Sequence, residues 1–197
     1  MAKLRDIITS QVRVKVLGLF YSKPNELFYI REATRIIDEE INAVRRELLK
    51  LSKEGLLYTE TRGNRQYFGA NKAYAYFPEL QQIVFKENGL GKKIRRMRRK
   101  LGKLDYVVFT TSFFNSEPKK TDALDILIIG EVVVPELEQL IKEEEKTLGR
   151  EINFTVLDNQ DFKFRKQRRD PFLMDVMYGK RIMIIGDEEE FVAKVNA

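Results

Sequence analysis

Residues 41–57 contain the pattern that most restricts how this chain can fold, INAVRRELLKLSKEGLL. Apolar residues recur there at spacings of three and four, which predicts an amphipathic helix with one buried face. Gly55 follows at a position where helices commonly end in a left-handed residue. The pattern is typical of an ordinary surface helix, and equally of a helix that presents basic residues to DNA. The positions expected to face inward are Ile41, Val44, Leu48 and Leu51.

The segments around this helix predict a compact arrangement of helices closed by a hairpin. Ser10 is suited to cap the first helix, and the second places Ala33, Ile36 and Ile37 inward. The sequence RGNR lies between two β-rich runs, and its Gly-Asn pair is typical of a tight hairpin turn. The expected elements are helices at 11–21, 31–37 and 41–54, a short strand at 26–30, hairpin strands at 56–61 and 66–70, and a helix at 74–84.

The composition excludes several kinds of chemistry. The chain has 197 residues with no cysteine and no histidine, which rules out disulfides, thiolate metal sites and histidine-based nucleophilic catalysis. Any catalysis would need carboxylates, lysine or Mg²⁺ held by carboxylates. The first residues lack the apolar core of a signal peptide, and no apolar run is long enough to span a membrane. We therefore expect a cytoplasmic protein with no membrane partner.

Positive charge is concentrated in the first half of the chain. Residues 1–100 contain 22 Lys and Arg against 11 Asp and Glu, whereas residues 101–197 contain 14 against 19. This split predicts two modules, of which the first is suited to a polyanion. We expect one domain at 1–87 and another at 105–197, joined by a linker and basic helix at 88–104. The cations of that helix, KKIRRMRRKLGKL at 92–104, are either a solvated face or additional phosphate contacts.

The N-terminal part resembles winged-helix transcription regulators of the ArsR/MarR type. The residues that carry the resemblance are AVRRELLKLSKEGLL at 43–57 and RGNRQYFGAN at 62–71, within residues 10–87. The resemblance implies a winged helix-turn-helix that binds double-stranded DNA as a homodimer, with one helix in the major groove. The hairpin would contact the backbone or the minor groove. The candidate DNA-binding residues are Asn42, Arg45, Arg46, Lys50, Arg62, Asn64 and Arg65.

Each of these candidates has a simpler interpretation as well. An exposed arginine is commonly a solvated surface charge, and an asparagine near the start of a helix is commonly a cap. Asn42 therefore has two roles open to it, a contact to a base edge or a helix cap.

Residues 105–197 alternate between β-rich runs and helices, which predicts an α/β domain with a small mixed sheet in a chain of α+β class. They resemble the small nucleotidyltransferases of the DNA polymerase β type. The segments that carry the resemblance are YVVFTTSFFNSEPKKTDALDILIIGE at 106–131 and GREINFTVLD at 149–158. The expected elements are strands at 106–110, 126–129, 152–157 and 182–185, and helices at 136–148, 159–178 with a break near Pro171, and 188–195.

Most of the carboxylates that this family uses to hold two Mg²⁺ ions are missing here. The resemblance places Ala123 and Asp125 at the paired acids, while the strand at 152–157 offers no third one. Asp122 is adjacent, but its side chain would point to the opposite face of the strand. We therefore expect a nucleotidyltransferase-like domain without transferase activity, cofactor or metal, used for assembly or for sensing a nucleotide effector. The candidate nucleotide pocket consists of Ser112, Lys119, Lys120 and Asp125.

The sequence leaves two other functions open. One is an active Mg²⁺-dependent nucleotidyltransferase that its winged helix directs to a target. The other is one member of a toxin–antitoxin-like pair, because small nucleotidyltransferases often have a partner protein.

Overall fold

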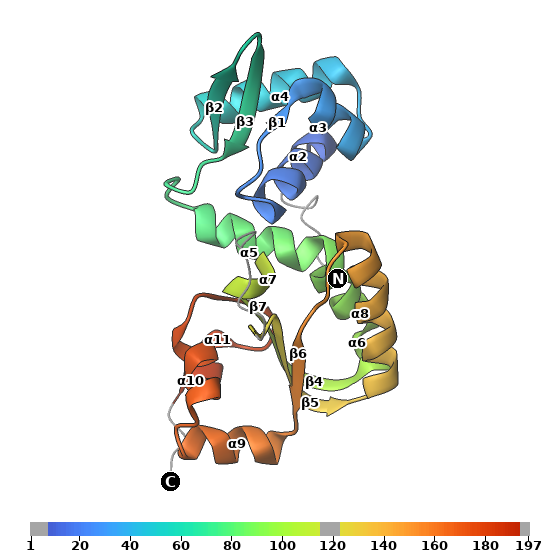
Figure 1. Cartoon of the computed structure of the whole chain (residues 1–197), viewed down its shortest axis with the longest axis vertical. Helices are drawn as coiled ribbons and strands as arrows, with labels where there is room; N and C mark the ends of the chain where they lie inside the picture. The colour runs from blue at the N-terminus through green and yellow to red at the C-terminus, as the bar shows by residue number, and fades with distance from the viewer. Residues whose placement is uncertain (1–7, 115–122, 194–197) are drawn as a thin grey trace. The chain divides into compact units, whose positions relative to one another are not determined.

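The computed structural model describes residues 8–114 and 123–193, and Figure 1 labels the helices and strands. The chain is a mixed α+β protein that divides into two compact units, residues 1–87 and 88–197. Each unit contains one small sheet. Within the described ranges, no helix is both long enough and apolar enough to cross a lipid bilayer.

The first unit has the predicted order of helix, short strand, two helices and hairpin. Ser10 caps the first helix as expected, because its side chain accepts a hydrogen bond from the Arg13 amide. The sheet has the antiparallel order β1-β3-β2. The last helix starts later than predicted, since Pro78 occupies its first turn, where a proline is tolerated. The elements are α2 (Gln11–Ser22), β1 (Phe28–Tyr29), α3 (Ile30–Ile37), α4 (Ile41–Lys53), β2 (Leu57–Arg62), β3 (Arg65–Ala70) and α5 (Phe77–Glu87).

The core of the first unit lies between α2, α3, α4 and the inner face of the sheet. Val44, Leu48 and Leu51 of α4 are fully buried, which confirms the stripe predicted for this helix. The prediction was wrong for Ile36 and Ile41, which are 48% and 42% exposed. Ile41 lies in the first turn of α4, ahead of the first residue of the helix that reaches the core. The remaining core side chains include Val16, Phe20, Phe28, Ala33, Leu57 and Phe68.

The hairpin turn is as tight as the Gly-Asn pair predicts. Arg62 and Arg65 pair directly across it, so Gly63 and Asn64 form a two-residue loop. Gly63 has a φ of +56° and Asn64 has a negative φ, the pattern of a type II′ turn. Such a turn matches the twist of the two strands. Figure 1 shows β2 and β3 as a projecting hairpin next to α4.

The second unit is built on a four-stranded mixed sheet, as predicted. The strand order is β6-β5-β4-β7, in which only β5 and β6 run parallel. The break predicted near Pro171 in the helix at 159–178 separates two helices, and Asp170 caps the second of them. The elements are α6 (Gly89–Leu101), β4 (Gly102–Thr110), α7 (Thr111–Phe114), β5 (Ile126–Val132), α8 (Val134–Leu148), β6 (Phe154–Leu157), α9 (Asn159–Gln167), α10 (Pro171–Tyr178), β7 (Arg181–Ile185) and α11 (Glu188–Val192).

The basic helix α6 is shorter at its C-terminal end than predicted and continues directly into β4. It ends at Leu101, so Leu104 belongs to the strand and not to the helix. Gly102 has a φ of +103°, and a Cβ there would lie 2.1 Å from the backbone oxygen of Glu131. Only glycine allows this abrupt change, because other residues rarely adopt such a φ and would clash with β5. At its other end, Asn88 alone separates α5 from α6.

Helices cover the sheet of the second unit. One face packs through Val108, Leu127 and Ile129 against apolar side chains of α9, α10 and α11. Alternate residues of β4 and β5, such as Val107 and Ile128, are buried on the other face. Helix α6 contacts β4, β7 and α8, and α6 and α8 run side by side in Figure 1. Burial on both faces explains why the sequence of β5 begins with a continuous apolar run.

Candidate nucleic-acid interface

Helix α4 presents one continuous exposed face, which we name the α4 face. At about 100° per residue, Asn42, Arg46 and Leu49 lie within about 60° of one another, opposite the buried stripe. Six side chains of α4 make up this face, and each of them is exposed to solvent. The face therefore combines an amide, an apolar side chain and four cations on a rigid support. Its members are Asn42, Arg45, Arg46, Leu49, Lys50 and Lys53.

Two of the three acids in the turn before α4 are engaged in local contacts. Glu40 caps the helix by accepting hydrogen bonds of 2.8 Å from the amides of Asn42 and Ala43. These bonds lower the pKa of Glu40 below its ordinary value, and the side chain of Asn42 and the nearby charge of Arg46 add to the effect. Glu39 pairs with Lys15 of α2 at 2.7 Å. Glu39 and Glu40, which would repel a polyanion, are thus both engaged in contacts within the first unit.

The single acid within α4 points away from the α4 face. Glu47 forms a salt bridge of 2.5 Å with the Nε of Arg13 on α2, and its side chain is only 13% exposed. This contact ties α4 to the preceding helix. Consequently, the α4 face carries cations and no carboxylate.

The hairpin carries two arginines that lie over tyrosine rings. The guanidinium of Arg65 lies 5.0 Å from the ring centre of Tyr29, and that of Arg62 lies 5.6 Å from Tyr67. The two tyrosines contact each other edge to face at 5.8 Å. Stacking of this kind restricts the orientation of both guanidinium groups. Glu60 also holds Arg62, by a 2.8 Å bond that lowers the pKa of Glu60.

The structure places all seven candidate DNA-binding residues on exposed positions of α4 and the hairpin. Because Glu40 is the N-cap of α4, Asn42 is not needed as the cap. The seven candidates do not include two other members of the α4 face, Leu49, which is 45% exposed, and Lys53. The signal for both was present, since they continue the Asn42–Arg46 row at helical spacing.

Asp125, in the second unit, serves as a structural anchor. Its carboxylate is fully buried, and its Oδ2 accepts a 2.9 Å hydrogen bond from the Asn153 amide. Arg150 lies 3.3 Å from the same oxygen, and its other terminal nitrogen donates to the Phe113 carbonyl at 3.0 Å. Arg150 therefore joins the start of β5 to α7 and to the segment before β6. No pattern in the sequence indicates this pairing.

The remaining residues of the candidate nucleotide pocket are less well connected. The Ser112 hydroxyl is buried and has no hydrogen-bond partner among the residues described. Lys119 and Lys120 lie outside the described residues, as does Asp122. Within 8–114 and 123–193, no three acidic side chains gather in a group that could hold a metal ion.

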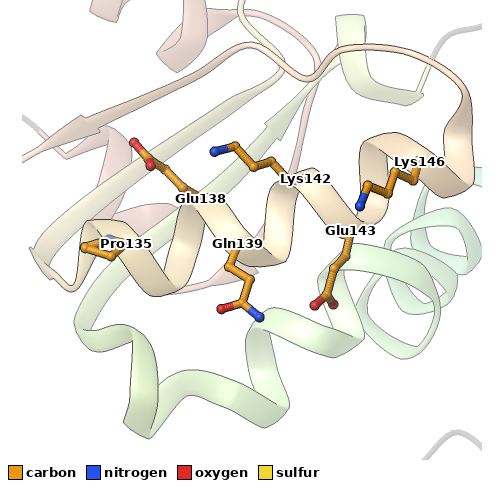
Figure 2. A pocket seen from close by; sticks show the side chains of 6 residues that line it. All are labelled: Pro135, Glu138, Gln139, Lys142, Glu143 and Lys146. Carbon is orange, nitrogen blue, oxygen red and sulfur yellow. The ribbon is translucent and has the colours of Figure 1, made fainter.

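A shallow hollow of about 420 Å³ lies along α8 instead. Figure 2 shows its six lining side chains, all of which project from this one helix. The lining mixes two glutamates with two lysines, so it favours no charged ligand. It includes neither Ser112 nor Asp125. The lining residues are Pro135, Glu138, Gln139, Lys142, Glu143 and Lys146.

Replacing Asp125 by alanine should destabilise the second unit by about 2 to 3 kcal/mol, because the substitution leaves Arg150 and the Asn153 amide without their acceptor. This figure is reduced for the partial exposure of Arg150. Hydrogen exchange of β5 and β6 in the full chain measures the loss. Asp175→Ala, at an exposed position of α10, is the control and should change stability by less than about 0.5 kcal/mol. Equal exchange in both variants would contradict the anchoring role.

Comparison with known proteins shows weak structural likenesses and no sequence match. No protein-family model matches the chain, and no curated protein matches it in sequence. Among solved structures, reduced HlyU from Vibrio cholerae is 13% identical, with a TM-score of 0.32 over 48% of this chain and 83% of that one. A mutant of the toxin–antitoxin pair MntA–HpeT is 15% identical, with a TM-score of 0.33 over 54% of this chain and 83% of that one. At these TM-scores, neither likeness carries a functional argument.

Proposed function

We propose that this protein is a transcription regulator that binds duplex DNA through its first unit, folded as a winged helix-turn-helix. In this proposal the α4 face enters the major groove, and Arg62 and Arg65 contact the backbone or the minor groove. The observation that carries the proposal is the acid-free basic face of α4 beside a hairpin with two stacked arginines.

The chemistry of the α4 face fits a duplex. Arginine and lysine side chains bind phosphates and position a protein on the backbone. Asn42 has the donor and acceptor pair that matches the edge of adenine, and Leu49 offers an apolar contact to a thymine methyl group. A rigid helix of about 10 to 12 Å diameter fits the major groove of B-DNA. The face therefore has groups for both positioning and base readout.

The proposal extends to a homodimer that binds two half-sites. Two recognition helices separated by one turn of duplex, about 34 Å, read a palindromic sequence. In this scheme the second unit, as a nucleotidyltransferase-like domain, takes part in assembly or in sensing a nucleotide effector. Its buried Asp125, held by Arg150, supports a structural use of this acid.

Fluorescence anisotropy with a random pool of labelled duplexes tests the proposal. We expect the full chain to bind duplex more tightly than the matching single strands, with two chains per duplex at saturation. The logarithm of the binding constant should fall with the logarithm of salt concentration with a slope of about −4 or steeper. Equal binding to single strands, or a slope near zero, would contradict the proposed function.

Glu60→Gln should strengthen duplex binding by about two- to five-fold, because it removes the charge that competes with phosphate for Arg62. The salt dependence should also steepen by about 0.9 if Arg62 gains one phosphate contact. The control is Glu26→Gln, which removes the acid of another exposed ion pair, the 3.2 Å contact to Lys23. Binding that is unchanged or weaker in Glu60→Gln, relative to this control, would show that Arg62 does not contact the duplex.

A further inference from the structure

Helix α6 concentrates positive charge in the second unit, which is otherwise rich in acids. Its sequence, GLGKKIRRMRRKL, contains seven cations and no acid over 13 residues. The rest of the unit does not share this character, since residues 101–197 have 14 Lys and Arg against 19 Asp and Glu. A local excess of this size raises the local concentration of polyanions.

The apolar side of α6 is already used inside the unit. Leu90, Ile94 and Leu101 are at most 2% exposed. A helix that lies in a membrane surface needs its apolar face free to enter the lipid. Because α6 buries that face within its own unit, it offers its surroundings charge alone. This arrangement suits the phosphates of a nucleic acid better than a lipid surface.

Six of the seven cations of α6 fall into two sets. Some hold the helix in place: Lys93 forms a 2.7 Å salt bridge with the buried Glu144, and Arg98 donates to the Leu104 carbonyl at 3.0 Å. Four others are exposed and form no ion pair with any acid in residues 8–114 and 123–193. We name this second set the α6 face, and its members are Lys92, Arg96, Arg99 and Lys100.

The α6 face has a regular geometry. At about 100° and 1.5 Å per residue, Lys92, Arg96 and Arg99 lie within about 60° of one another and span about 10 Å along the helix. They lie opposite the buried stripe of Leu90, Ile94 and Leu101, so the helix is held with this row outward. Duplex DNA carries one charge per about 1.7 Å of its axis, which allows several phosphates to face such a row.

We propose that the α6 face is a second, sequence-independent phosphate-binding surface for the duplex that the first unit binds. This inference rests on the proposed function and adds the second unit to it. Each unit then contributes its own phosphate contacts, but only the α4 face reads bases. The α6 face has arginine and lysine without an amide or apolar group among its four members, a composition suited to phosphate contacts, which carry no sequence information.

The test compares two full-chain variants that remove four charges each. The first changes Lys92, Arg96, Arg99 and Lys100 to glutamine; the matched control changes Lys142, Lys146, Lys163 and Lys180, exposed lysines of the same unit, to glutamine. Binding to a labelled random duplex is measured between about 50 and 200 mM salt. The α6 variant should lower the salt slope by about 2 to 4, weaken all duplex sequences alike, and leave the control near wild type.

Three outcomes would overturn the inference. One is an unchanged slope in the α6 variant, and another is an equal loss in the control variant. The third is binding to vesicles of phosphatidylserine that requires the α6 face, while duplex binding does not. Loss of the proposed function is recognised separately, because duplex binding would then survive removal of the arginines of α4 and the hairpin. Circular dichroism of each variant establishes that the helices remain folded.

Discussion

Duplex affinity at about 150 mM salt should fall at least about 100-fold when four exposed arginines are replaced together by alanine. Two of them lie on the α4 face and two on the hairpin, so the variant removes charge from both proposed contacts. The salt slope should lose about 3 to 4, since each phosphate contact contributes about 0.9. Fluorescence anisotropy of the full chain measures both quantities. The four residues are Arg45, Arg46, Arg62 and Arg65.

The control for this variant removes the same charge from the second unit. Alanine at Lys142, Lys146, Lys163 and Lys180 lowers the net charge by the same amount, at exposed positions of the second unit. A loss of less than about three-fold is expected in this control, because only long-range attraction is reduced. If the two variants lose affinity equally, net charge rather than the α4 face drives binding, and the assignment of the interface is wrong.

Leu48→Ala should destabilise the first unit by about 3 kcal/mol, within the range of about 2 to 5 kcal/mol seen for leucine truncation in cores. Leu48 is fully buried between α4 and the rest of the core, so the substitution leaves a cavity. Hydrogen exchange of peptides from α2 and α4 should accelerate about 100-fold. An increase in exchange rate no larger than that caused by a surface substitution would contradict the packing of α4.

The neighbouring residue supplies a matched control with an opposite expectation. Leu49 is 45% exposed, so Leu49→Ala should change the stability of the first unit by less than about 0.5 kcal/mol. Its effect should appear in duplex binding instead, as weaker preference for sites that contain thymine at the contacted position. The two adjacent leucines would then have different roles, Leu48 in the stability of the fold and Leu49 in DNA recognition. An unchanged sequence preference would show that Leu49 does not contact the bases.

The elements of both units could be predicted from the sequence because local patterns determine them. The spacing of Val44, Leu48 and Leu51 predicts α4, and Gly63 with Asn64 predicts the hairpin turn. The small mixed sheet follows from β-rich runs separated by helical segments. In each case the information lies within a few residues of the element itself.

Contacts between distant segments could not be predicted in this way. The Arg13–Glu47 salt bridge holds the single acid of α4 away from the α4 face, yet the two residues are far apart in the sequence. Likewise, Arg150 meets Asp125 only because β5 and β6 are neighbours in the sheet. The end of α6 at Gly102 depends on the backbone of Glu131, which belongs to the adjacent strand. A pattern in one segment contains none of these partners.

Contacts formed in the fold decide which cations are engaged with acids or aromatic rings and which stay exposed. On α6, Lys93 is held by Glu144 while Lys92 and Arg96 stay exposed, although all three look alike in sequence. On the hairpin, Arg62 is shared between Glu60 and the Tyr67 ring. Which cations are available to a phosphate is therefore a property of the fold. This is why charge-removal variants need controls matched for charge and exposure.

Arginine footprinting tests the central claim most directly. The full chain is modified with phenylglyoxal in the presence and absence of a bound duplex, and the modified residues are located by mass spectrometry. We predict strong protection of Arg45, Arg46 and Arg65 by duplex, with Arg169, exposed on the second unit, as an internal reference that stays reactive. Unchanged reactivity of the three arginines at saturating duplex would contradict binding through α4 and the hairpin.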